Sequence, residues 1–72
     1  MALPALWQIV DRSRLRDDPV AEFINRFYSD DNWLVAVTPI AKRMGCSRRQ
    51  VRRRLLRLEQ AGAVRKYYDP RT

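Results

Sequence analysis

The fold is decided by residues 38–65, which read TPIAKRMGCSRRQVRRRLLRLEQAGAVR. At the start of this stretch Thr38 is followed by Pro39, and such a pair is typical of the first turn of a helix. Gly45 is typical of a helix end, because glycine adopts the left-handed conformation there without a steric penalty. We therefore predict a helix over 38–44 that Thr38 caps.

A second helix is predicted to begin almost at once. Ser47 and Gln50 have the spacing of a capping box, in which each side chain bonds the backbone N–H of the other residue. Gly62 predicts the end of this helix near Ala61. Two helices joined by a turn of about two or three residues are the arrangement of a helix-turn-helix motif.

The second helix has one apolar face and one basic face. At about 100° per residue, Val51, Leu55 and Leu58 share a face that must pack inward. The arginines on the opposite face are Arg49, Arg53 and Arg57. A helix about 10–12 Å across fits the major groove of DNA, so this face can meet base edges and phosphates together. A solvated arginine face without a ligand is the alternative.

The position of each side chain on the helix predicts its contact. Arg49 and Arg53 lie one turn apart near the helix start and are expected to bind guanine, while Gln50 either pairs with adenine or serves only the capping box. The residues expected to contact the DNA backbone are Thr38, Ser47, Arg48, Arg52, Arg57, Arg65 and Lys66. For Thr38 a purely structural capping role is the alternative.

The flanking segments complete one domain over residues 1–72. A helix over about 4–12 is predicted by the helical spacing of Leu3, Leu6, Trp7 and Val10. Asp18 followed by Pro19 predicts the start of a further helix, and short apolar runs at 33–37 and 63–68 predict strands. The fold class is thus mainly α with a small β wing, a winged helix-turn-helix with an extra N-terminal helix.

The wing itself is short. A full wing needs a hairpin, yet only Arg71 and Thr72 follow the turn at Asp69 and Pro70. Either the strand at 63–68 pairs with the strand at 33–37, or the chain is truncated, or a partner completes the wing.

The motif resembles the DNA-binding domains of prokaryotic winged helix-turn-helix regulators of the DeoR and AsnC types. The residues that carry the resemblance are Ala41, Gly45, Ser47, Val51, Leu55, Leu58, Glu59, Gly62 and Val64. It implies a recognition helix over about 48–61 that enters the major groove of double-stranded DNA. Cys46 stands where these regulators usually have a small apolar residue, and we expect a packed, inert thiol there.

Charge supports a polyanionic partner. The net charge is +7, with four basic groups against six carboxylates in residues 1–40 and eleven against two in residues 41–72. This separation is expected of a nucleic-acid-binding surface. Thirteen of the basic residues are arginine, whose planar fork binds phosphates and guanine edges better than lysine does.

Several classes of protein are disfavoured. One cysteine and no histidine exclude an internal disulfide and the usual zinc sites, and they remove the commonest general base. We expect no enzyme activity, no cofactor, no metal and no small-molecule ligand.

No apolar run approaches the ~20 residues that span a bilayer, so we expect a cytoplasmic protein without a membrane partner. Trp7 and Trp33 are expected in the core.

These observations favour a small, sequence-specific transcriptional regulator that acts as a homodimer. A single recognition helix reads few base pairs, and a dimer doubles the contacts. We expect the dimer interface on the N-terminal helix, because the winged core does not need this helix. Its residues are Leu3, Leu6, Trp7 and Val10. Packing of these side chains within the monomer is the alternative. Two alternatives remain: an accessory DNA-binding factor in plasmid or phage replication, partition or recombination, and a winged-helix protein-interaction module.

Overall fold

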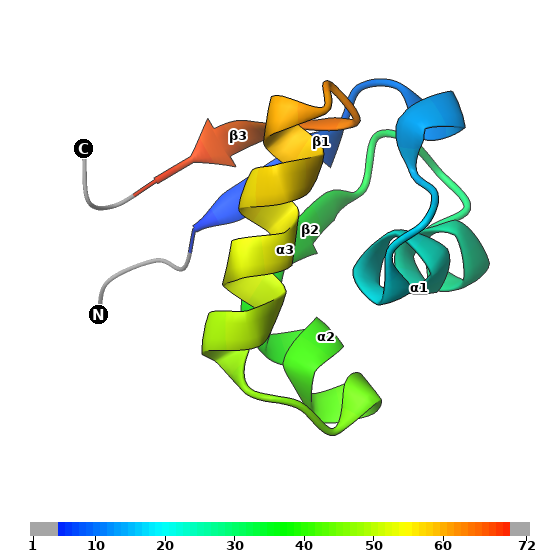
Figure 1. The fold of residues 1–72 in the computed structure, drawn as a ribbon. Helices are drawn as coiled ribbons and strands as arrows, with labels where there is room; N and C mark the ends of the chain where they lie inside the picture. The colour runs from blue at the N-terminus through cyan, green and yellow to red at the C-terminus, as the bar shows by residue number, and fades with distance from the viewer. Residues whose placement is uncertain (1–4, 70–72) are drawn as a thin grey trace.

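A long helix lies across a small antiparallel sheet, with two shorter helices beside it (Figure 1). The computed structural model describes residues 5–69. In chain order the elements are β1 (Leu6–Ile9), a single 3-10 turn (Arg12–Arg14), α1 (Pro19–Phe27), β2 (Leu34–Ala36), α2 (Val37–Met44), α3 (Arg48–Gln60) and β3 (Val64–Tyr68).

Most helix ends lie where the sequence predicts them. The Asp18 side chain caps α1, with Pro19 in the first turn. Ser47 and Gln50 form both hydrogen bonds of the capping box at the start of α3. Gly45 and Gly62 have φ angles of +68° and +83°, the left-handed conformation expected after a helix. These predictions are confirmed.

The predicted capping role of Thr38 is wrong. The strand β2 runs directly into α2, so the helix begins at Val37 and its N-cap is Ala36, which makes no side-chain hydrogen bond. Thr38 and Pro39 therefore lie inside the first helical turn. Proline is tolerated there because the first backbone N–H groups of a helix have no partner within it.

The predicted N-terminal helix is also wrong. Residues 6–9 form β1, the central strand of the sheet, antiparallel to both β2 and β3. Trp7 and Ile9 alternate inward and are buried, whereas Leu6 and Gln8 are half-buried. The spacing of four apolar residues fits a short helix as well as a strand. Only the two strands on either side, which come later in the chain, favour the strand.

This strand also corrects the predicted wing. β3 does not pair with β2, as the first of the three interpretations required; β1 lies between them. The second strand that β3 needs therefore comes from the N-terminal side of the chain. Leu6 lies opposite Tyr68, so both ends of the described segment lie at the same end of the sheet.

The core lies between the sheet and the three helices. Its largest fully buried side chains are Trp7, Ile24, Ile40, Leu55, Val20, Val35, Val51 and Val64. Trp33, expected in this core, is half exposed because it lies in the turn before β2. Cys46 is a free, partly buried thiol, and Leu56 is a partly buried side chain that packs against the core.

Candidate nucleic-acid interface

The inward face of α3 is the one that the sequence predicts. Val51, Leu55 and Leu58 are buried, and the helix contacts α1, α2 and β3. The exposed side chains of its outer face include Arg49, Arg53 and Arg57. The second helix of the motif thus presents a row of guanidinium groups to solvent.

Ion pairing divides the arginines of α3 into two groups. Arg54 lies 3.2 Å from the carboxylate of Asp18, and Arg52 lies 3.9 Å from the carboxylate of Asp69. Among residues 5–69 no such pair is formed by Arg48, Arg49, Arg53 and Arg57. The second group can bind a phosphate or a base without first breaking an internal ion pair. Arg52, by contrast, is partly buried and lies over the Trp7 ring, 6.0 Å from its centroid.

A polar hollow lies along α3. Its volume is about 160 Å³, and it is lined by Gln50, Arg53, Arg54 and Arg57. Arg53 and Arg57 bring two guanidinium groups without an ion pair in residues 5–69 to this hollow, while Arg54 is paired with Asp18, and no carboxylate lines the hollow. This lining favours an anion such as a phosphate oxygen.

Gln50 has two possible roles that compete. Its Oε1 atom accepts a hydrogen bond from the backbone N–H of Ser47, at 3.3 Å. Bidentate pairing with adenine would use the same oxygen. Gln50 can therefore make both hydrogen bonds to adenine only if the capping bond to Ser47 breaks. Base recognition by Gln50 remains a prediction.

A second hollow lies between α2 and the start of α3. Thr38, Lys42 and Arg48 line it together with Ala41 and Cys46, and its volume is about 370 Å³. Thr38 and Arg48, both expected at the DNA backbone, are thus brought together. Lys42 was not among the residues predicted to contact DNA, although a lysine one turn after Thr38 on the same helix was a usable signal.

The two basic residues of β3 have partners within the chain. The Arg65 guanidinium donates two hydrogen bonds to Oε1 of Gln8, at 3.1 and 2.9 Å. The Lys66 ammonium lies 3.6 Å from Asp69, and its backbone N–H donates to the Glu59 carboxylate at 3.2 Å. A contact of the Arg65 side chain with the DNA backbone would compete with its bonds to Gln8, and one of the Lys66 side chain would compete with the Asp69 pair.

The predicted dimer interface is wrong, because those of its residues that the structure describes do not form one exposed surface. Trp7 has no exposed area within a single chain, and Leu6 is half-buried in the sheet. Val10 is 58% exposed. Leu3 lies outside the described residues.

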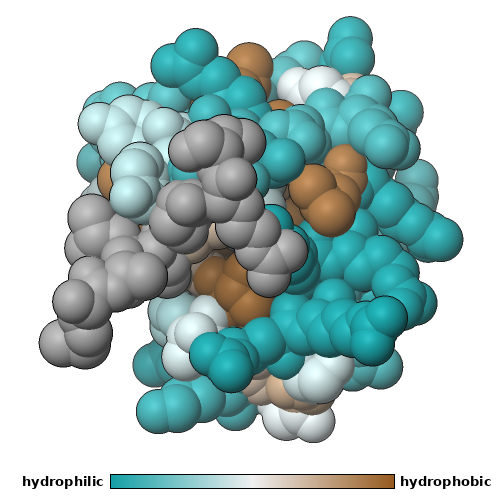
Figure 2. Space-filling model, turned by 90° about the vertical axis from the view of Figure 1, so that its left-hand side faces the viewer, coloured by the Kyte–Doolittle hydropathy of each residue, from teal (hydrophilic) through white to brown (hydrophobic). Residues whose placement is uncertain are grey.

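On the face where β3 ends, side chains are mostly hydrophilic, with small and separate hydrophobic patches (Figure 2). Within the described part of the chain, no helix is both long and apolar enough to cross a membrane.

A helix-turn-helix packed on a small antiparallel sheet, with exposed arginines along its second helix, defines a winged helix-turn-helix domain of the DNA-binding type. A family model described as "Helix-turn-helix domain" matches residues 23–64, and the chain belongs to this family. Comparisons with curated proteins and with solved structures gave no match. The matched family is general, so the resemblance to DeoR-type and AsnC-type regulators stays a prediction.

Proposed function

We propose that the protein is a sequence-specific regulator of transcription, a binding protein rather than an enzyme, that places α3 in the major groove of double-stranded DNA. The observation that carries this proposal is the row of exposed arginines on α3 that form no ion pair within residues 5–69. Arg49 is the principal candidate for base recognition, because it lies in the first turn of α3 and opposite the buried face.

The proposal includes a two-fold dimer on DNA. A single α3 reads few base pairs, and two copies bound to half-sites about one helical turn apart would give a unique site. Sedimentation of the protein on its selected site tests this part. A complex with one protomer per site would contradict the dimer and leave DNA binding itself intact.

Selection from a pool of random duplexes tests sequence specificity. The enriched site and a scrambled duplex are then compared with the wild type, Arg49→Ala and Arg16→Ala, the last being an exposed arginine outside the motif. Arg49→Ala should lose about 1–3 kcal/mol of binding free energy on the enriched site and relax the preference at one base pair. Arg16→Ala should retain that preference.

Salt dependence tests the electrostatic part. If about 4–8 phosphates are neutralised per protomer, log affinity should fall with log salt at about −0.9 per phosphate. A slope near zero, or equal affinity for every duplex, would contradict the proposed function.

A further inference from the structure

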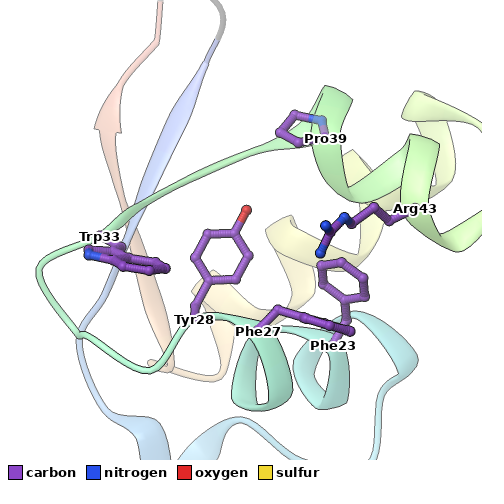
Figure 3. A pocket seen from close by; sticks show the side chains of 6 residues that line it. All are labelled: Phe23, Phe27, Tyr28, Trp33, Pro39 and Arg43. Carbon is purple, nitrogen blue, oxygen red and sulfur yellow. The ribbon is translucent and has the colours of Figure 1, made fainter.

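Four aromatic side chains gather at the end of α1 and in the turn before β2 (Figure 3). They are Phe23, Phe27, Tyr28 and Trp33. Together with Pro39 and Arg43 of α2 they line an open hollow of about 240 Å³. No residue of α3 lines this hollow, so it is distinct from the arginine row described above.

Two of the four rings are exposed. Phe27 is 45% exposed and Trp33 is 50% exposed, although the same chain buries Trp7 completely. The ring centroids of Phe23 and Phe27 are 4.6 Å apart, and those of Tyr28 and Trp33 are 6.2 Å apart. The half-buried rings of Phe23 and Tyr28, whose centroids are 6.5 Å apart, join the two pairs into one cluster. Clustered apolar surface of this kind marks an interaction site more often than scattered residues do.

Positive groups lie at the Phe27 end of the cluster, whereas the exposed carboxylates of Asp30 and Asp31 stand in the same turn as Trp33. The guanidinium groups of Arg26 and Arg43 lie 5.8 and 5.3 Å from the centroid of the Phe27 ring. Neither arginine forms an ion pair within residues 5–69, and no carboxylate lines the hollow. A ligand that carries a carboxylate beside an apolar group would complement both features.

The arrangement of the rings disfavours stacked nucleobases. Single-stranded nucleic acid is bound on flat aromatic faces that are free to stack. Here two guanidinium groups lie over the Phe27 ring, and Trp33 meets Tyr28 edge-to-face at 78°. A hollow between tilted rings is better suited to one bulky side chain, since a cavity of about 150 Å³ already holds a benzene molecule.

The size of the cluster disfavours a second copy of the chain. A stable interface buries about 800 Å² per partner, whereas an aromatic side chain buries about 150–250 Å² in full. Phe27 and Trp33 expose only about half of that each. A two-fold pairing would also bring the arginines of the two copies together.

We propose that this hollow binds a short segment of a partner protein in which a bulky apolar side chain stands beside Asp or Glu. The apolar side chain enters the hollow beside the Tyr28 ring, and the carboxylate pairs with Arg43, which lines the same hollow (Figure 3). Because no residue of α3 lines the hollow, the inference does not depend on the proposed DNA function.

The experiment selects a displayed library of random peptides against the whole chain. Enriched peptides should share an apolar residue next to an acidic one, and their binding should shift the NMR signal of the Trp33 indole N–H while the signal of the buried Trp7 stays in place. Trp33→Ser and Arg43→Glu should each weaken the enriched peptides about tenfold or more. Tyr67→Ser and Arg16→Glu are matched controls, since both residues are exposed and lie outside the hollow; these variants should bind as the wild type does.

Circular dichroism establishes whether each variant is folded. If Trp33→Ser does not fold, Arg43→Glu still tests the proposal. The proposal is overturned if no peptide is enriched, or if enriched peptides bind Trp33→Ser and Arg43→Glu as well as the wild type. It is also overturned if Trp33 responds instead to single-stranded oligonucleotides, or if sedimentation shows self-association that Trp33→Ser abolishes.

Discussion

The guanidinium of Arg54 on α3 lies 3.2 Å from the carboxylate of Asp18, which is also the N-cap of α1. One oxygen of that carboxylate accepts hydrogen bonds from the backbone N–H groups of Val20 and Ala21, and the other faces the arginine. A single side chain thus caps α1 and pairs with α3.

Replacing Asp18 separates these two roles. Asp18→Ala should lower the free energy of unfolding by about 1 kcal/mol for the lost cap, with a smaller loss for the partly exposed ion pair. Asp18→Asn keeps a good cap and loses only the charge, so it should cost less. Urea denaturation of both variants measures the difference, and equal costs would show that capping contributes little.

Trp7 should behave as a core residue and not as an interface residue. Its side chain is completely buried within one chain, so Trp7→Ala should cost about 3–5 kcal/mol, much of the stability of a small domain. Loss of the circular dichroism signal, rather than dissociation of a dimer into folded monomers, is the expected result. Trp33→Ala, at a half-exposed position, serves as the control and should stay folded.

The two glycines after α2 and α3 differ in their surroundings. A Cβ atom on Gly62 would lie 2.8 Å from Nη1 of Arg14, whereas one on Gly45 would meet nothing within 4 Å. Gly45→Ala should therefore cost only the left-handed strain of about 1–2 kcal/mol. Gly62→Ala should cost more, because Arg14 must also leave the carbonyl of Ala61, to which it donates at 2.9 Å. Equal unfolding midpoints in urea would contradict this difference.

Replacing Arg65 tests its predicted contact with the DNA backbone. Arg65→Ala should weaken specific and random duplexes alike and reduce the salt slope by about one. Gln8→Ala removes the same two internal hydrogen bonds but keeps the charge, so its salt slope should match the wild type. A changed base preference in Arg65→Ala would show that the docking orientation is wrong.

Tyr28 gives the stability a dependence on alkaline pH. Burial raises the pKa of its hydroxyl above the ordinary value of 10.0, an effect that the nearby Arg43 partly offsets. A raised pKa means that the folded state holds its proton longer, so this contribution is complete below about pH 10 and is lost as the pH rises further. Tyr28→Phe should flatten that decline in urea denaturation followed across alkaline pH.

Elements specified by neighbouring residues could be predicted from the sequence. The caps at Asp18 and Ser47 and the helix end at Gly62 depend on contacts within a few positions along the chain. The N-terminal strand could not be predicted, because its pairing partners lie far away; Gln8 and Arg65 are separated by 57 positions.

The same distinction holds for the candidate site. The outward direction of Arg49 and Arg53 follows from helical periodicity alone. Periodicity does not show which arginines form ion pairs within the chain. Arg53 and Arg54 are adjacent, yet of the two only Arg54 pairs with a carboxylate, that of Asp18 at the start of α1. The exposure of Trp33 was equally hidden, since one aromatic residue in a turn has no periodicity to place it.

The central position of β1 has a topological consequence. Because Leu6 lies opposite Tyr68, a short linker between the two ends would join β3 to β1 as a continuous hairpin. Opening the chain in the segment between Ile9 and Pro19 would then give a circular permutant with the order helix, strand, helix, helix and hairpin. The natural chain and this permutant would share every strand pairing. They would differ in the loop-closure entropy of the sheet, because the pairing of β1 with β3, the most distant in the natural chain, would become a hairpin.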